Sequence, residues 1–170
     1  EAIPHLPEEK RMEQLSKIQG ILEHSHSDIR HIAHNLLPTV LEKEGLVQAT
    51  AQFASEVNAT KLVNILIKDK NSNANKLSKQ LQLMLFRVIQ ELVNNIIKHS
   101  QAQNAEIIFS RHPNGLQIEV SDDGIGYDGM NKPGEQGLYS ITQRLKSIGG
   151  NFKITKSNSG GTQATVELTV

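Results

Sequence analysis

Four polar side chains near the middle of the chain have the types and the spacing to serve a nucleotide. Glu91, Asn95 and His99 are four residues apart. Lys98 follows Asn95 by three, so on a helix all four can project from one face. An asparagine oxygen is a hard ligand of the kind that Mg²⁺ accepts beside water and phosphate, a lysine can offset phosphate charge, and a glutamate can position or polarise a water or an acceptor group. A merely solvated face of an amphipathic helix would show the same pattern.

An aspartate pair followed by glycines, Asp122-Asp123-Gly124-Ile125-Gly126, comes directly after a strand-like segment. Glycine lets a backbone approach a ligand closely, and an aspartate at a strand end can accept a hydrogen bond from an exocyclic amine. Aspartate and glycine also dominate ordinary turns. The motif therefore fits either a plain turn or a site for an amine-bearing base.

Two further glycine-rich stretches lie nearer the C-terminus. Gly134-Glu135-Gln136-Gly137-Leu138 leads into a helix-like segment, where free amides and the helix dipole favour phosphate. Gly160-Gly161-Thr162 precedes the last strand-like segment, and a tight hairpin explains it adequately. Neither stretch is specific on its own.

A helix over residues 77–98 is expected to carry the first polar group. Its apolar residues recur at helical spacing, and we expect them on the face opposite the polar side chains: Leu85, Val88, Ile89, Leu92 and Ile96. The other expected elements are a short helix over 46–57, strands over 62–68, 105–111, 116–120, 151–157 and 162–169, a loop over 69–75 and a helix over about 138–148. This order predicts an α+β sandwich, with helices on one face of a mixed, mostly antiparallel sheet.

The N-terminal segment predicts one long helix over residues 8–36. Its seam residues alternate three and four apart, with one polar interruption: Leu15, Ile18, Leu22, Ser25, Ile29, Ile32 and Leu36. Such a narrow stripe favours a partner helix in a hairpin or a dimeric bundle, although a helix lying on its own domain is the alternative. Pro38 is expected to end or kink this helix.

Composition excludes several classes of function. Lysine plus arginine and aspartate plus glutamate both number 18, and a general nucleic-acid binder usually carries a basic excess. The chain has no cysteine, which rules out disulfides and thiolate metal sites. No apolar run approaches the roughly 20 residues needed to span a bilayer, and the first residues do not resemble a signal peptide. We expect a cytoplasmic fragment of a longer protein, with no membrane contact of its own.

In their order and spacing over about residues 80–170, the four motifs together resemble the nucleotide-binding boxes of the GHKL ATPase superfamily, which includes gyrase, Hsp90, MutL and histidine kinases. This resemblance implies a Bergerat-type α/β sandwich that binds ATP with Mg²⁺. The segment from Gln90 to His99 resembles the N box. By that match Asn95 is the Mg²⁺ ligand and Glu91 is the catalytic acidic residue one turn earlier. Lys98 and His99 are then neighbours of the phosphates.

The remaining boxes supply the other implied nucleotide contacts. Asp122 matches the aspartate that reads the adenine amino group, and Gly124 and Gly126 match the glycines of the same box. Gly137 and Leu138 match the second glycine box, which closes the ATP lid. Thr162 matches a threonine near the adenine end. Glu135 stands where the second glycine box often has its first glycine. Arg144, Leu145, Gly149 and Gly150 resemble the helix that follows the lid in histidine kinases.

The segment Ile29 to Pro38, followed by Leu41 and Gly45-Leu46, resembles the second helix of a histidine-kinase dimerisation stalk. The subclass is the one that pairs with NarL/LuxR-type response regulators. The resemblance implies part of a stalk over residues 1–41 and an ATP-binding catalytic domain over residues 42–170. It also implies a homodimer in the full-length protein, which passes phosphate from ATP to a stalk histidine and then to the regulator's receiver domain.

The family's phosphoacceptor histidine normally lies on the first stalk helix and precedes an acidic residue. None of the seven histidines here precedes Asp or Glu, so we expect that the chain begins between the two stalk helices and does not autophosphorylate at the usual site. His31 or His34 as acceptor is one alternative. A metal site is another, although of His24, His26, His31 and His34 only the last two could share a helix face.

Two rival functions stay open. One is a nucleotide-binding regulatory module without catalysis. The other is a different GHKL member, such as an anti-sigma-factor serine kinase, but that activity would need no stalk helix.

Overall fold

The computed structural model describes residues 39–113, 115–127, 135–157 and 160–169. Internal contacts divide the chain after residue 38, so the described residues form the second of two units. The heptad helix expected over residues 8–36 lies outside them, with all its histidines. The predicted division into a stalk and a catalytic domain therefore stays a prediction.

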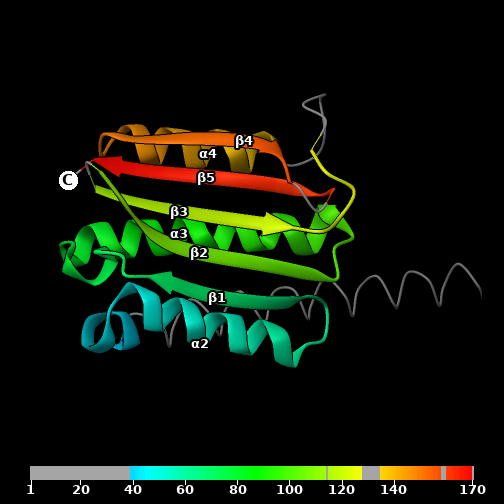
Figure 1. Ribbon diagram of the computed structural model, residues 1–170, viewed down its shortest axis with the longest axis horizontal. Helices are drawn as coiled ribbons and strands as arrows, with labels where there is room; N and C mark the ends of the chain where they lie inside the picture. The colour runs from blue at the N-terminus through cyan, green and yellow to red at the C-terminus, as the bar shows by residue number, and fades with distance from the viewer. Residues whose placement is uncertain (1–38, 114, 128–134, 158–159, 170) are drawn as a thin grey trace, which may run out of the picture. The chain divides into compact units, whose positions relative to one another are not determined.

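The described unit is a five-stranded sheet with helices on one face (Figure 1). The sheet order is β1-β2-β3-β5-β4, with β1 parallel to β2 and every other pair antiparallel. This confirms the predicted α+β class. The elements are α2 (Leu46–Ala59), β1 (Asn64–Lys70), the 3₁₀ turn η2 (Ala74–Lys76), α3 (Lys79–Asn95), the π turn η3 (Ile96–Ser100), β2 (Asn104–His112), β3 (Gly115–Asp122), α4 (Glu135–Lys146), β4 (Gly150–Lys156) and β5 (Thr162–Thr169).

Several boundaries differ from those expected, and local hydrogen bonds explain two of them. The first strand begins at Asn64, because the Asn58 side chain both accepts from Ile65 N (2.7 Å) and donates to Ile65 O (3.0 Å). It then runs into the stretch expected to be a loop. The helix expected from residue 77 begins at Lys79, because the Ser78 hydroxyl accepts from Leu81 N and caps it.

The core forms between the inward faces of the central strands and the apolar stripe of α3. Alternate residues of β2 and β3 are buried, among them Ile107, Phe109 and Ile118. Phe53 of α2 and Phe86 of α3 meet edge to face, with ring centroids 6.0 Å apart. This contact joins the two helices beneath the sheet. Among the described residues, no helix is long and apolar enough to cross a membrane.

Two leucines of α3 provide a matched test of this core. Leu85 is 0% exposed and Leu83 is 40% exposed. We expect Leu85→Ala to lower the free energy of unfolding by about 2–5 kcal/mol, because it leaves a cavity between helix and sheet. The same change at Leu83 should cost about 1 kcal/mol or less. Urea unfolding of the two variants checks this, and equal losses would contradict the packing described here.

Candidate functional site

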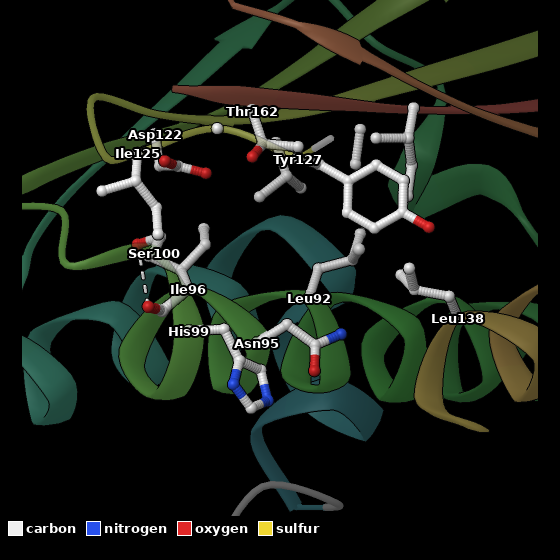
Figure 2. Close-up of a pocket in the computed structure, with 14 residues that line it drawn as sticks. Leu92, Asn95, Ile96, His99, Ser100, Asp122, Ile125, Tyr127, Leu138 and Thr162 are labelled. Carbon is white, nitrogen blue, oxygen red and sulfur yellow. Dashed lines mark hydrogen bonds between the residues drawn. The ribbon is translucent and has the colours of Figure 1, made fainter. Parts of the chain in front are cut away.

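A cavity of about 260 Å³ lies between the C-terminal end of α3 and one end of the sheet. In Figure 2, Asn95 and His99 project from the helix, and Asp122 and Thr162 lie on the opposite wall. The loop after β3 and the first turns of α4 complete the lining. The lining residues are Leu92, Asn95, Ile96, His99, Ser100, Val120, Asp122, Ile125, Gly126, Tyr127, Leu138, Ile154, Thr162 and Ala164.

The helix end that forms one wall is a π turn, not a continuation of α3. The Ser100 hydroxyl donates to Ile96 O (2.8 Å) and accepts from Ala102 N (3.0 Å), and Gln101 then leaves the helix in the left-handed conformation. A π turn changes the angular spacing of side chains and is often found at functional sites. Lys98 and His99 are both exposed, but only His99 lines the cavity.

The cavity is lined by residues from both the polar and the apolar face expected on this helix. Leu92 and Ile96 belong to the apolar stripe, yet they line the same cavity as Asn95. Residues three and four apart are neighbours on a helix surface, and the cavity covers the boundary between the two faces. The wall is therefore apolar with an amide set into it.

Glu91 lies one turn before Asn95 but does not line the cavity. It is partly buried and sits beside the first turn of α4. A Cβ added to Gly137 would lie 2.5 Å from the Glu91 Oε1 atom and 3.7 Å from the Asn95 Nδ2 atom. The absence of a side chain at Gly137 thus lets α4 approach this carboxylate, while its neighbour Leu138 lines the cavity.

The Asn95 amide has an unmet hydrogen-bonding capacity. Its Nδ2 atom is buried and has no hydrogen-bond partner among the described residues. A buried donor without an acceptor costs about 1–3 kcal/mol, so native structures rarely leave one without a functional reason. A phosphate oxygen can accept from this N–H, and the amide oxygen has the chemistry of a Mg²⁺ ligand. The residue therefore fits the Mg-nucleotide that the sequence predicts.

Asp122 forms the opposite wall at the end of β3 and is only 4% exposed. Its Oδ1 atom accepts a hydrogen bond from Gly124 N (2.8 Å). A Cβ added to Gly161 would lie 2.2 Å from the Asp122 carbonyl oxygen and 2.5 Å from Oδ1. Only glycine at position 161 therefore lets the start of β5 pack against this aspartate.

Asp123, next along the chain, turns away from the cavity and binds the start of β2. Its Oδ1 accepts from Gln103 N and Asn104 N, and its Oδ2 accepts from Asn104 Nδ2, each at 2.9 Å. The hydrogen bond from Asn104 N is the largest cause of a pKa below the usual aspartate value. A lowered pKa means that this group stabilises the fold at neutral pH, and the contribution is lost as the pH falls through the folded-state pKa.

The structure brings together six of the ten predicted site residues: Asn95, His99, Asp122, Gly126, Leu138 and Thr162. Glu91, Lys98, Gly124 and Gly137 are near the cavity in sequence but do not line it. Gly134 lies outside the described residues, and only the helical backbone of Glu135 is described.

Sequence reasoning missed several lining residues, most of them apolar or small. Ser100, Ile125, Tyr127, Ile154 and Ala164 were not singled out. Ile125 stands inside the motif of residues 122–126, and Ser100 and Tyr127 each directly follow a motif. That proximity is the one signal that would have included them. Ile154 and Ala164 look like ordinary strand residues, and only the pairing of β4 with β5, where they are partners, places them at the cavity.

Comparison with known proteins identifies the class. Residues 80–170, more than half of the chain, match the family described as histidine kinase-, DNA gyrase B- and HSP90-like ATPase. The chain belongs to this family. It carries the ATP-binding module of the sensor histidine kinase type.

The curated relatives that match this chain are named as sensor or sensor-like histidine kinases. The chain is 31% identical to the sensor histidine kinase ComP of Bacillus subtilis, over 82% of this chain and 18% of ComP. It is 24% identical to the oxygen sensor histidine kinase NreB of Staphylococcus carnosus, over 91% of this chain and 45% of NreB. The chain spans less than half the length of the curated relatives that it matches.

Solved structures agree on the fold. The histidine kinase domain from the Erythrobacter litoralis blue-light activated histidine kinase EL346 has a TM-score of 0.64 at 16% identity, over 84% of this chain and 73% of that one. The Acinetobacter baumannii histidine kinase AdeS has a TM-score of 0.56 at 16% identity, over 96% and 86%. The predicted GHKL fold is thus confirmed.

The glycine pair before β5 tests the packing around Asp122. We expect Gly161→Ala to weaken binding of an ATP analogue at least about tenfold, because the new methyl group must displace Asp122 and overpacking costs about 1–3 kcal/mol. Gly160→Ala is the matched control. Its Cβ has nothing within 4 Å, but the φ of +102° strains any other residue. Both variants should lose stability in thermal unfolding, and only Gly161→Ala should lose affinity in calorimetry. Equal affinities would contradict the role of Gly161.

Proposed function

We propose that this chain is the catalytic module of a longer sensor histidine kinase. It binds ATP with Mg²⁺ and supplies the γ-phosphoryl group for histidine autophosphorylation, and the phosphoryl group then passes to a response regulator of the NarL/LuxR type. The observation that supports this most directly is that a buried aspartate and an asparagine, whose buried Nδ2 has no partner in the described part of the chain, line one apolar cavity from opposite walls (Figure 2).

Asp122 is the proposed adenine-reading residue. Its carboxylate is buried at the sheet end, where an acceptor can distinguish an exocyclic amine from a carbonyl group. Val120, Ile154 and Ala164 provide apolar surface for the faces of the base. Thr162 lines the same wall, and Gly124 and Gly126 shape the loop beside it.

The helix wall is the proposed phosphate side. Asn95 is the one Mg²⁺ ligand that we assign to the protein, with phosphate oxygens and water completing the shell, as Mg²⁺ usually requires. His99 and the exposed Lys98 are placed to offset phosphate charge from the π turn. Gly137 and Leu138 bring the start of α4 to this side as the end of the proposed lid.

Most of the catalysis in such a site is positioning and charge neutralisation. A bound Mg²⁺ ion would neutralise charge on the phosphate oxygens. The chain's own residues hold the base, orient the phosphates and exclude water through the apolar wall. Glu91 is the proposed catalytic acidic residue, and its place beside Gly137 keeps its carboxylate close to both Asn95 and α4.

The whole protein's assembly forms part of the same proposal. Residues 1–41 would form part of the stalk through which the full-length protein dimerises, and the first stalk helix would present the acceptor histidine to the catalytic domain. The relatives named as sensor histidine kinases support this reading. The chain would then be the cytoplasmic portion of a receptor that passes its signal to a receiver domain.

Calorimetric titration with ADP and a non-hydrolysable ATP analogue, with and without Mg²⁺, tests the nucleotide site. We expect the chain to bind both, and Asp122→Asn to weaken binding at least about tenfold, because an amide donor replaces one of the two buried carboxylate acceptors and would face the amine of the base. Asn95→Ala should remove the gain from Mg²⁺ and lower Mg-free binding only by the loss of one hydrogen bond to phosphate.

Two matched controls accompany these variants. Asp69→Asn changes an exposed aspartate at the far end of β1, and Asn94→Ala changes the neighbouring asparagine, which does not line the cavity. Both should bind as the unaltered chain does. If the intact, folded chain bound no adenine nucleotide, the proposed site would be wrong, and the fold would be a degenerate one used for protein contacts.

Phosphotransfer is tested with γ-labelled ATP. A longer form of the protein that includes the first stalk helix should acquire acid-labile, base-stable phosphohistidine, and Asp122→Asn in that form should abolish it. The 170-residue chain should bind ATP without becoming labelled, because no histidine in it matches the usual acceptor motif. Label on His31 or His34 of the short chain would instead place the acceptor on the segment assigned here to the second stalk helix.

A further inference from the structure

Asp123 connects the two walls of the cavity without lining it. It lies between Asp122 and Gly124 in the loop after β3. Its carboxylate accepts three hydrogen bonds, two from the main chain of residues 103 and 104 and one from the Asn104 side chain. Its own N–H donates to Asn104 O at 3.1 Å. Four hydrogen bonds therefore hold the loop at this one residue.

The partner segment is the direct continuation of the helix wall. Residues 101–104 follow the π turn that carries His99, and Ser100 at its end accepts from Ile125 N at 2.9 Å. The loop is thus attached to the helix end on both sides of Gly124. Since a Cβ on Gly124 would lie 2.1 Å from Ser100 O, the two segments are in backbone contact.

We infer that Asp123 is a positioning residue that fixes the separation between the adenine-reading wall at Asp122 and the phosphate-side wall at Asn95. This inference rests on the proposed nucleotide site. An ordinary turn after β3 would need no such side chain, because the bond from Gly124 N to Asp122 Oδ1 already closes it. A carboxylate with three donors makes charge-assisted hydrogen bonds, which are stronger than neutral ones and define the geometry.

A ligand held at both ends is sensitive to that separation. Adenosine needs only the adenine wall, whereas ATP with Mg²⁺ gains affinity from both walls at once. If the loop shifts relative to the helix end, the two sets of contacts are no longer satisfied together, and the gain from the phosphates falls. The effect on adenosine alone should be small.

The test compares Asp123→Ala and Asp123→Asn with Asp69→Ala as matched control. Asp69 is also an exposed aspartate, and it accepts a main-chain hydrogen bond from Ser72 N at 2.9 Å. It lies near the end of β1 that is remote from Asn104, the partner of Asp123. Affinities for adenosine and for an ATP analogue with Mg²⁺ are measured by calorimetry. Asp123→Ala should lose about tenfold in affinity for the analogue and at most about threefold for adenosine, within the range for residues that modulate coupling without touching the ligand.

A second readout separates positioning from simple loss of stability. Asn95→Ala is measured alone and combined with Asp123→Ala. If Asp123 keeps Asn95 in register with the base, the Asn95 substitution costs less affinity in the Asp123→Ala background. Asp123→Asn should restore most of the affinity, because its remaining oxygen can accept from both Gln103 N and Asn104 N.

The measurements distinguish a positioning role of Asp123 from a purely structural one. Additive losses, equal losses for adenosine and for the analogue, or identical behaviour of Asp123→Ala and Asp69→Ala would overturn the positioning role. These results would leave the nucleotide site itself intact, because the unaltered chain would still bind. Failure of the unaltered chain to bind any adenine nucleotide would instead overturn the proposed function on which the inference rests.

Discussion

The backbone contact between the end of the π turn η3 and the loop after β3 is the constraint on which the site depends. Ile125 N donates to Ser100 O, and Gly124 has no room for a side chain against the same carbonyl group. A helix that covers a sheet is normally separated from the sheet by the side chains that pack between them. Here the π turn and the glycine bring helix end and strand end into direct backbone contact.

The cavity's chemistry follows from the kinds of element that meet there. Central strands and an amphipathic helix can bury only apolar residues and a few satisfied polar ones. The walls are therefore mostly Leu, Ile, Val and Ala. Among the few polar groups, Asp122 is held by Gly124 N, and Asn95 Nδ2 has no partner among the described residues. A water-poor wall strengthens each remaining polar contact with a ligand, which suits a site that recognises a base by very few groups.

The sequence predicted the class of the fold and which segments form helices and strands, because the spacing of apolar residues depends only on neighbouring positions in the chain. It placed Asn95 and His99 on one helix and Asp122 at a strand end, and these positions follow from spacing alone. It did not predict that Leu92 and Ile96 share the cavity with Asn95, since that depends on where the sheet lies relative to the helix. The tertiary contacts of Gly161 with Asp122 and of Asp123 with Asn104 join residues about 19 to 39 positions apart, and no local pattern encodes them.

The same tertiary contacts explain why isolated motifs are weak indicators of function. An Asp-Asp-Gly sequence makes a turn wherever it occurs, and here it does make one, through the bond from Gly124 N to Asp122 Oδ1. What distinguishes this turn is what packs against it: Gly161 of β5 on one side, and Ser100 at the end of the π turn on the other. The proposed nucleotide site depends on this three-way junction, because it buries Asp122 at the cavity and leaves Asp123 to hold the junction together.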